Sequence, residues 1–288
     1  MITGAAKRTL ISALEEDLGS GDLTSEAIFR EGLPVVAEVI VKDERLRARG
    51  GVLAGLEEAL FLLDHVGGIT IEEVKEDGGR IAWGERVLSL SGEVKKILAV
   101  ERTILNILGR MSGIATLTRW LQEDHGVRVA ATRKSPPGLL SLDKKAVELG
   151  GGYPHRRGLY EKILIKDNHL SALMMGGLSR EEAIQQAIER CRSRGPVEIE
   201  VESAAEALWA ADCGAEIVML DNFTPKEARA AAGELRPRGV KIELSGGITP
   251  ENIGDYAAVE PDWISLGAIT HSAKALDMSL ELRASPTP

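Results

Sequence analysis

Six short runs of β-branched and aliphatic residues recur along the second half of the chain, and each is followed by polar residues and a helical pattern. The runs are VRVAAT (127–132), KILIKD (162–167), VEIEVES (197–203), EIVMLDN (216–222), VKIELSGG (240–247) and DWISLGA (262–268). Two capping boxes between them, Ser179 with Glu182 and Thr224 with Glu227, mark helix starts. Apolar strands that alternate with helices form a parallel sheet, so the sequence predicts an α/β fold with a closed or open sheet.

The first hundred residues indicate a separate region of mixed helices and strands. Helical patterns cover 7–18 and 53–66, and strand patterns cover 35–42, 69–75 and 86–92. A long helical run from 93 to 123 joins this region to the α/β region, because no linker rich in Gly, Ser or Pro separates the two.

The charge of the chain is unevenly distributed. The 288 residues include 35 Lys and Arg against 44 Asp and Glu, which gives a formal net charge of −9. This balance and the low aromatic content argue against a nucleic-acid partner. Within 128–166, however, nine cationic residues stand against three acids, so this segment carries +6. Such a cationic segment within an acidic protein suggests a pocket for a small polyanion, and the alternative is a solvated basic face.

The sequence also predicts a cytoplasmic protein that does not enter a membrane. No stretch approaches the roughly 18 uninterrupted apolar residues of a membrane span, and the first residues turn acidic before any apolar signal region forms. Cys191 and Cys213 form no CxxC pair, which favours a reducing compartment. Walker, GxSxG and HExxH motifs are absent, which removes the usual ATPase, hydrolase and zinc-protease interpretations.

Polar residues and glycines end the predicted strands, where parallel α/β folds place their active sites. They comprise cations for carboxylates or phosphates (Arg133, Lys134, Lys166 and the His155–Arg156 pair), acids for a hard cation such as Mg²⁺ (Glu200 and Asp221), and small-residue loops for a phosphate (245–250 and 266–268). Thr249 and Pro250 predict a helix start, whose free N–H groups favour phosphate. Glu198, Glu200 and Glu202 alternate on one strand, so one or two of them are open to a simpler interpretation as solvated or Lys-paired acids. His169 is open to a simpler interpretation as a satisfied loop histidine.

Several segments closely resemble the quinolinate phosphoribosyltransferase family, and the resemblance covers nearly the whole chain. They are ATRK (131–134), AVELGGGYPHRRGLYEKILIKDNHL (146–170), VEIEVES, MLDN, ELSGGIT, SLGAITHSAKALDMSL (265–280), EDLGSGDLTSEAI (16–28) and ERTILNILGRMSGIAT (101–116). ATRK, PHRxGL and LIKDNH in this order form a very specific set.

The resemblance implies a two-domain fold and a particular reaction. An N-terminal α/β sandwich domain is expected at 1–109, joined by the C-terminal tail 270–288, and an incomplete α/β barrel of about seven strands at 110–269. A homodimer or hexamer with active sites shared between subunits is implied. The reaction transfers phosphoribose from 5-phosphoribosyl pyrophosphate to quinolinate, with Mg²⁺ beside the pyrophosphate. Pyrophosphate and carbon dioxide leave, and nicotinate mononucleotide results for NAD biosynthesis.

The matching positions imply roles for individual residues. Arg133, Arg156 and Lys166 match groups that hold the two quinolinate carboxylates, with His155 beside them, and Arg102 matches an arginine donated by the neighbouring subunit. The implied catalytic residues are Lys134, Glu200 and Asp221, of which the two acids contact the metal directly or through substrate and water. The implied substrate-binding loops contribute Thr132, Ser245, Gly246, Gly247, Leu266, Gly267 and Ala268.

Two segments depart from the family pattern. The stretch 135–140 (SPPGLL) stands where Thr-rich residues and an arginine are usual, and Pro154 replaces the usual asparagine. Both flank the charged residues without changing them, so they affect loop geometry rather than the class of reaction.

Three other functions are weighed against this one. A relative encoded with molybdate-transport systems would lose much of the Lys-Asp-Asn-His run, which is intact here. A nicotinate-specific phosphoribosyltransferase would not need the extra arginines, which suit a dianionic ring. A non-catalytic binder of a phosphorylated sugar would have little use for Glu200 and Asp221 near a phosphate.

Overall fold

The computed structural model describes residues 2–284, which form two compact units. The first comprises 2–119, 135–151 and 271–284, and the second comprises 120–134 and 152–270. Helix α4 (Val94–His125) passes from one unit into the other. The expected domain boundary at 109–110 falls inside this helix, and 135–151 groups with the first unit rather than with the barrel. Residues 285–288 of the expected C-terminal tail lie outside the described residues.

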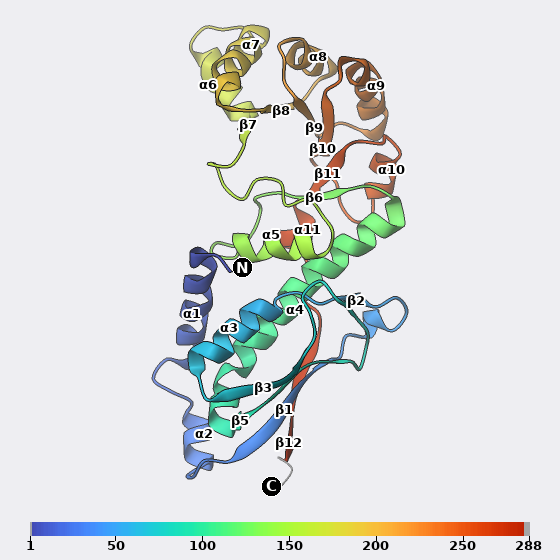
Figure 1. Ribbon diagram of the computed structural model, residues 1–288. Coiled ribbons are helices and arrows are strands. Elements are labelled where there is room, and N and C mark those ends of the chain that lie inside the picture. The colour runs from blue at the N-terminus through green and yellow to red at the C-terminus, as the bar shows by residue number, and fades with distance from the viewer. Residues whose placement is uncertain (1, 285–288) are drawn as a thin grey trace. The chain divides into compact units, whose positions relative to one another are not determined.

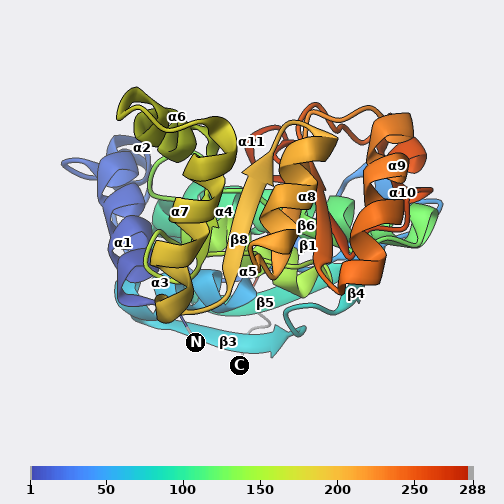
Figure 2. The ribbon, with the colours of Figure 1, turned by 90° about the horizontal axis from the view of Figure 1, so that it is seen from above.

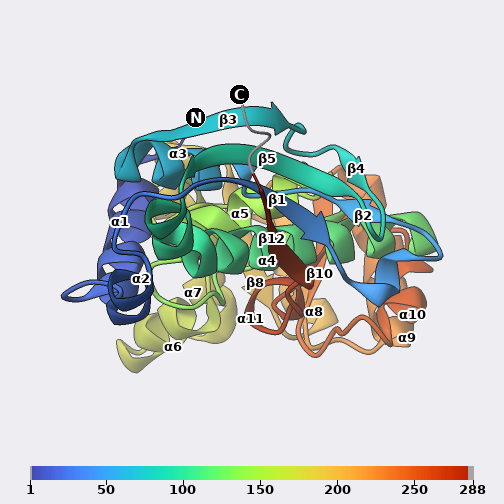
Figure 3. The same cartoon turned by 90° about the horizontal axis from the view of Figure 1, so that it is seen from below.

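The first unit is built on a four-stranded antiparallel sheet in the order β12-β1-β5-β3 (Figure 1, Figure 3). Its strands are β1 (Pro34–Val41), β3 (Ile69–Val74), β5 (Arg86–Glu93) and β12 (Met278–Ala284), and β2 (Gly51–Val52) pairs separately with β4 (Arg80–Ile81). Its other elements are α1 (Gly4–Leu18), α2 (Leu23–Ile28), η1 (Glu44–Leu46), α3 (Leu56–Val66) and α5 (Leu140–Leu149). The C-terminal strand thus returns to the N-terminal region.

Two ion pairs hold α5 within the first unit. Arg110 donates hydrogen bonds of 2.9 and 2.8 Å to the two carboxylate oxygens of Asp143, which is fully buried. Lys145 Nζ lies 2.9 Å from the buried carboxylate of Glu58 on α3. Lys144 and Lys145, two of the nine cationic residues of the segment 128–166, thus belong to the first unit.

The second unit is built on a six-stranded parallel sheet in the order β6-β11-β10-β9-β8-β7. Its strands are β6 (Val129–Ala131), β7 (Ile163–Ile165), β8 (Val197–Val201), β9 (Ile217–Asp221), β10 (Lys241–Ser245) and β11 (Trp263–Leu266). The helical elements are α6 (Asp167–Met175), α7 (Arg180–Cys191), η2 (Arg192–Arg194), α8 (Ala204–Asp212), α9 (Pro225–Leu235), η3 (Arg236–Arg238), α10 (Ile253–Ala257) and α11 (Ala268–His271). Helices α7, α8 and α9 stand side by side over one face of the sheet (Figure 2).

All six predicted strands are present, and so are the capping boxes at Ser179 and Thr224. The predicted helix start at Thr249 is wrong, because α10 begins only at Ile253. The Asn252 side chain accepts a hydrogen bond of 2.8 Å from the Thr249 N–H and donates one of 3.1 Å to the Gly247 carbonyl, which holds this segment as a turn.

The sheet is a curled half-barrel with β6 and β7 at its edges. Outside the named strands of the described residues, Tyr153 makes one parallel bridge with Ala130 on β6. The seventh strand of the expected incomplete barrel is thus reduced to a single bridging residue.

Strand alternation separates the apolar from the polar side chains of this sheet. On β8, Ile199 and Val201 are fully buried on one face, whereas Glu198 and Glu200 point to the other. The parallel register aligns Ser245 with Asp221 on the neighbouring strand. The carboxyl ends of β7 to β10 therefore meet at one edge of the sheet, which we call the carboxyl edge.

Candidate active site

A cation and two acids from three neighbouring strands gather at the carboxyl edge. Lys166 follows β7, and its Nζ lies 2.5 Å from Glu200 Oε2 on β8. Asp221 ends β9 beside this pair. Burial raises the pKa of the Asp221 carboxyl, and the Glu200 charge raises it further, while Ser245, Lys166 and Lys134 act in the opposite direction. These groups therefore share one electrostatic environment.

The loop after β10 approaches the end of β9 very closely. The Asn222 N–H donates a hydrogen bond of 3.0 Å to the Ser245 carbonyl. Gly246 has a φ of +84°, and a Cβ atom there would lie 2.4 Å from the Asn222 amide nitrogen. Gly247 also has a positive φ, of +64°, but open space around its Cα. Glycine at 246 is thus required by both backbone conformation and space.

Two arginines approach each other near these acids. Arg156 is 5% exposed, whereas Arg133, in the segment after β6, is exposed. Burial lowers the pKa of Arg156, and the positive charge of Arg133 lowers it further, while Glu198 and Glu200 oppose both effects. Two guanidinium groups this close to each other are suited to an anionic ligand, because an anion would offset their mutual repulsion.

The segment after β6 is tied to the segment after β11. The Lys134 N–H donates a hydrogen bond of 3.1 Å to Thr132 Oγ1. Thr270 Oγ1 lies 2.7 Å from the Lys134 carbonyl oxygen and 3.1 Å from that of Gly267. Leu266 ends β11, and Ala268 begins α11. The predicted residues of these two segments therefore lie together.

His155 is buried and turned toward acids in the interior of the half-barrel. Its Nε2 lies 3.0 Å from Glu198 Oε1 and 3.1 Å from Glu243 Oε2. The Trp263 indole N–H donates a hydrogen bond to the same Glu243 oxygen. Glu198 is thus a buried partner of a histidine. The interpretation of one or two of the three strand acids as solvated or Lys-paired applies instead to Glu202, which is exposed, and to Glu200, which pairs with Lys166.

The ionisation of this cluster is strongly perturbed. Burial opposes protonation of His155, but hydrogen bonds to both carboxylates outweigh it and raise the pKa of the ring. The Arg156 N–H works against this rise, because it donates a hydrogen bond of 2.8 Å to Nδ1. Burial, aided by the Glu243 charge, raises the pKa of Glu198 to about 7. For Glu243, contacts with His155 outweigh burial and lower the pKa.

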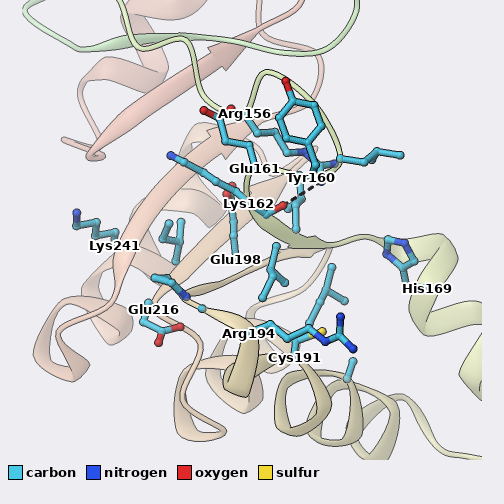
Figure 4. A pocket seen from close by; sticks show the side chains of 18 of the residues that line it. Arg156, Tyr160, Glu161, Lys162, His169, Cys191, Arg194, Glu198, Glu216 and Lys241 are labelled. Atoms are coloured by element: carbon cyan, nitrogen blue, oxygen red, sulfur yellow. Dashed lines mark hydrogen bonds between the residues drawn. The ribbon is translucent and has the colours of Figure 1, made fainter.

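A cavity of about 1250 Å³ lies beside β7, whose three residues belong to its lining (Figure 4). Its lining includes Arg128, Lys162 and Lys241, which lie at the amino-terminal ends of strands, together with Arg156 and Glu198. The predicted catalytic residues Lys134, Glu200 and Asp221 do not line it. Of the predicted substrate-binding residues, Arg156 alone is part of this lining.

The predicted Arg102 lies outside the second unit. It is an exposed residue of α4 in the first unit, and the other predicted site residues all belong to the second. The loop 135–140 also belongs to the first unit, where the Thr9 hydroxyl donates a hydrogen bond of 3.2 Å to the Gly138 carbonyl.

Glu243 and Trp263 were missed as parts of the site's surroundings. Glu243 is fully buried in the middle of β10. Its position in the sequence is a usable signal, because an acid in the middle of an otherwise apolar strand is expected to be buried. A buried carboxylate needs a partner, so the sequence could have predicted a polar contact for Glu243.

The fold and this edge define an α/β protein with a site for an anionic ligand. Two family models match nearly the whole chain: "Quinolinate phosphoribosyl transferase, N-terminal domain" over residues 22–112 and "Quinolinate phosphoribosyl transferase, C-terminal domain" over residues 114–281. The chain therefore belongs to the quinolinate phosphoribosyltransferase family.

Individual relatives agree with this membership. The chain is 42% identical to a probable nicotinate-nucleotide pyrophosphorylase [carboxylating] of Methanothermobacter thermautotrophicus, over 94% of this chain and 96% of that protein. It is 37% identical to the nicotinate-nucleotide pyrophosphorylase [carboxylating] of Mycobacterium leprae, over 96% of this chain and 97% of the relative. The solved structure of NadC from Streptococcus pyogenes matches with a TM-score of 0.88 at 35% identity and covers 99% of each chain.

Proposed function

We propose that this chain transfers phosphoribose from 5-phosphoribosyl pyrophosphate to the ring nitrogen of quinolinate at the carboxyl edge. Pyrophosphate and carbon dioxide are released, and the product is nicotinate mononucleotide for NAD biosynthesis. Family membership over both domains supports the class of reaction. The observation that carries the location of the site is the grouping of Lys166, Glu200 and Asp221 across three adjacent strands.

The acceptor carboxylates are held by the cations at this edge. Quinolinate carries two carboxylates, and Arg133 and Arg156 offer two planar forks close to each other. Lys166 adds a point charge whose partner, Glu200, keeps its ammonium group at the edge. The clamp acts mainly by aiming the pyridine nitrogen at the anomeric carbon of the donor.

The donor phosphate is held by the glycine loops after β10 and β11. Ser245, Gly246 and Gly247 bring backbone N–H groups to the edge without a Cβ at either glycine. Gly267 lies in the neighbouring loop and is linked to Lys134 through Thr270. This arrangement supports binding of the 5-phosphate close to Lys134.

The two acids fit a magnesium ion. Glu200 and Asp221 supply oxygen ligands on adjacent strands, which suits a hard cation that keeps water and takes phosphate oxygens. The raised pKa of Asp221 fits as well, because a nearby cation would favour its charged form. Glu200 and Asp221 would hold Mg²⁺ directly or through water and pyrophosphate, and the ion would offset charge on the leaving group.

The side chains of the edge perform the remaining steps by electrostatics. Loss of pyrophosphate leaves positive charge on the ribose, and the Glu200 carboxylate, oriented by Lys166, stabilises it. Lys134 lies near both substrates and offsets negative charge. No covalent nucleophile is needed, because the ring nitrogen attacks the sugar directly. The quaternised nitrogen then accepts the electron pair released when the 2-carboxylate leaves.

The active site is shared between subunits of a homodimer or hexamer in the cytoplasm. Arg102 is exposed on α4 and available to a neighbouring subunit, where it would join the acceptor clamp. Among the described helices, none is long and apolar enough to cross a membrane.

Turnover of a labelled substrate tests the proposed function. Protein, Mg²⁺, 5-phosphoribosyl pyrophosphate and quinolinate labelled in its 2-carboxylate should give nicotinate mononucleotide and labelled carbon dioxide in equal amounts. Asp221→Asn should abolish most of this turnover. The control is Asp212→Asn. Asp212 is an exposed acid at the last position of α8, and it pairs with Arg238.

Each alternative function gives a different result in the same assay. Product from nicotinate without carbon dioxide would indicate a nicotinate-specific enzyme, and saturable binding without product would indicate a binding protein. A relative with another substrate would neither bind quinolinate nor release carbon dioxide from it.

A further inference from the structure

A buried network of four side chains lies beneath the carboxyl edge. His155, Glu198 and Glu243 are 6%, 2% and 0% exposed, and Trp263 is 5% exposed. One ring nitrogen of His155 contacts both carboxylates, at 3.0 and 3.1 Å, and Trp263 anchors Glu243 from the next strand. The network thus connects β8, β10 and β11 to the segment before β7.

Stability alone is a poor reason for this network. Buried charged networks often contribute nothing, or cost free energy, relative to well-packed apolar residues. The backbone of His155 is also unfavourable, with a φ of +55° in the left-handed region. Such a conformation persists only where the surroundings hold it firmly, and it clusters at functional sites. The contacts to Glu198 and Glu243 provide that hold.

The network leads directly to the next residue in the chain, Arg156. The Arg156 N–H donates a hydrogen bond of 2.8 Å to His155 Nδ1. Its guanidinium Nη1 lies 3.5 Å from the Lys162 carbonyl oxygen, and it senses the charge of Arg133. Glu198 and Glu243 thus hold the His155 ring through its Nε2 atom. The ring in turn fixes the backbone N–H of Arg156 through its Nδ1 atom.

We infer that Glu243, together with Glu198, is a positioning residue that sets the orientation of Arg156 through His155. This inference rests on the proposed function, in which Arg156 holds a carboxylate of quinolinate. The network then determines acceptor affinity while leaving the donor site unaffected, because the donor loops depend on Gly246 and Gly267 rather than on His155.

The same groups could instead be read as metal ligands, since His155, Glu198 and Glu243 are the cluster among the described residues whose ligand atoms lie within 4.8 Å of one another. The Arg156 contact argues against this. Nδ1 accepts a hydrogen bond, so the ring proton lies on Nε2, between the carboxylates. A protonated Nε2 has no lone pair for a metal.

The decisive variant is Glu243→Gln, which keeps the shape of the side chain and removes its charge. We expect the KM for quinolinate to rise about five- to twentyfold, while kcat and the KM for 5-phosphoribosyl pyrophosphate change less than about twofold. His155→Asn should act in the same way, because asparagine tolerates a positive φ but cannot reach both acids. The matched control is Asp262→Asn. Asp262 lies just before β11, and its carboxylate accepts a hydrogen bond of 2.8 Å from the Ile242 N–H on β10 rather than from a side chain of the network, so both KM values should stay unchanged.

The outcomes separate positioning from general damage. Parallel changes in both KM values and kcat, or an unchanged KM for quinolinate in a folded Glu243→Gln protein, would overturn the inference. If Glu243→Gln does not fold, Trp263→Phe decides, because it removes the indole N–H from Glu243 and keeps a ring next to Tyr153. It should raise the quinolinate KM selectively but less, and an unchanged KM overturns the inference.

Two further results distinguish the other failures. One zinc ion per purified wild-type chain, lost in Glu243→Gln, would replace positioning by metal binding. A wild-type protein that yields no nicotinate mononucleotide contradicts the proposed function itself. Calorimetric titration of quinolinate then tests the positioning role alone, and equal affinity in wild type and Glu243→Gln would refute it.

Discussion

Lys166 and Glu200 meet across two parallel strands, with Nζ and Oε2 2.5 Å apart. The lysine side chain is 44% exposed and the glutamate 14%. An ion pair this open to solvent contributes only about 0–1 kcal/mol to folding. Its location at the carboxyl edge, beside Asp221, therefore matters more for ligand binding than for stability.

Lys166→Gln should impair activity without destabilising the fold. We expect kcat/KM for quinolinate to fall about ten- to hundredfold, as expected for the loss of about 1.5–3 kcal/mol from a charge-assisted bond. The free energy of unfolding, from denaturant titration, should change by less than about 1 kcal/mol. Arg238→Gln removes a comparable exposed ion pair with Asp212 and should leave both quantities unchanged. A large loss of stability in Lys166→Gln would assign the pair a structural role instead.

Arg133→Gln should discriminate between a dianionic and a monoanionic ring. Arg133 and Arg156 each offer a guanidinium group to one carboxylate of quinolinate. The loss of one guanidinium should therefore lower the affinity for quinolinate by about ten- to hundredfold. Nicotinate, with one carboxylate, should lose less affinity. Competition binding with the two acids measures the ratio. Arg157→Gln, at an exposed residue that pairs with Glu161, is the control. Equal losses for both ligands would contradict a clamp with two forks.

Gly246 and Gly247 form a matched pair for the phosphate loop. Gly246→Ala places a Cβ 2.4 Å from the Asn222 amide nitrogen in a backbone at φ +84°. Gly247→Ala meets no atom within 4 Å, so its cost is only that of its φ of +64°, about 1–2 kcal/mol. Gly246→Ala should be clearly more destabilising in denaturant titration and should raise the KM for 5-phosphoribosyl pyrophosphate. Similar effects of both changes would mean that the contact with Asn222 relaxes freely.

Glu198 should make the free energy of unfolding depend on pH. Burial raises its folded-state pKa to about 7, above the ordinary value of 4.5. Stability from the bound proton is thus fully present below pH 4.5 and is lost as the pH rises through 7. Glu198→Gln, which stays neutral, should lack this loss, so its stability relative to wild type should rise by about 1–3 kcal/mol between pH 4.5 and 8.

Denaturant titrations across this pH range provide the measurement. Glu202→Gln, which alters an exposed acid just beyond β8, should give a curve parallel to that of wild type. If Glu198→Gln also runs parallel to wild type, Glu198 is charged in the folded protein throughout this range.

The strands and the carboxyl edge were predictable because their signals are local. Each strand is a short apolar run followed by polar residues, and parallel topology brings the ends of such runs together wherever they lie in the sequence. Lys166, Glu200 and Asp221 are therefore neighbours as expected. The helix start at Thr249 failed for an equally local reason, since Asn252 captures the Thr249 N–H and the Gly247 carbonyl in a turn.

The network around His155 could not be predicted from local signals in the sequence. Glu243 lies 88 positions from His155, and only the folded sheet brings them together. No spacing in the sequence pairs a loop histidine with an acid in the middle of a strand. The placement of α5 is a similar case, because it depends on the contact of Asp143 with Arg110, 33 residues earlier.

Complementation between subunits tests the shared site. Arg102→Ala should impair quinolinate use and leave the chain folded, because Arg102 is exposed on α4. Lys134→Ala should inactivate the edge of its own subunit. In mixed oligomers, one interface combines an intact Arg102 with an intact Lys134, so part of the wild-type activity should return. Turnover is measured after co-expression with two different tags and tandem purification, with each variant alone as control. Verified mixed oligomers that remain as inactive as either parent would show that Arg102 serves its own subunit or does not contact quinolinate.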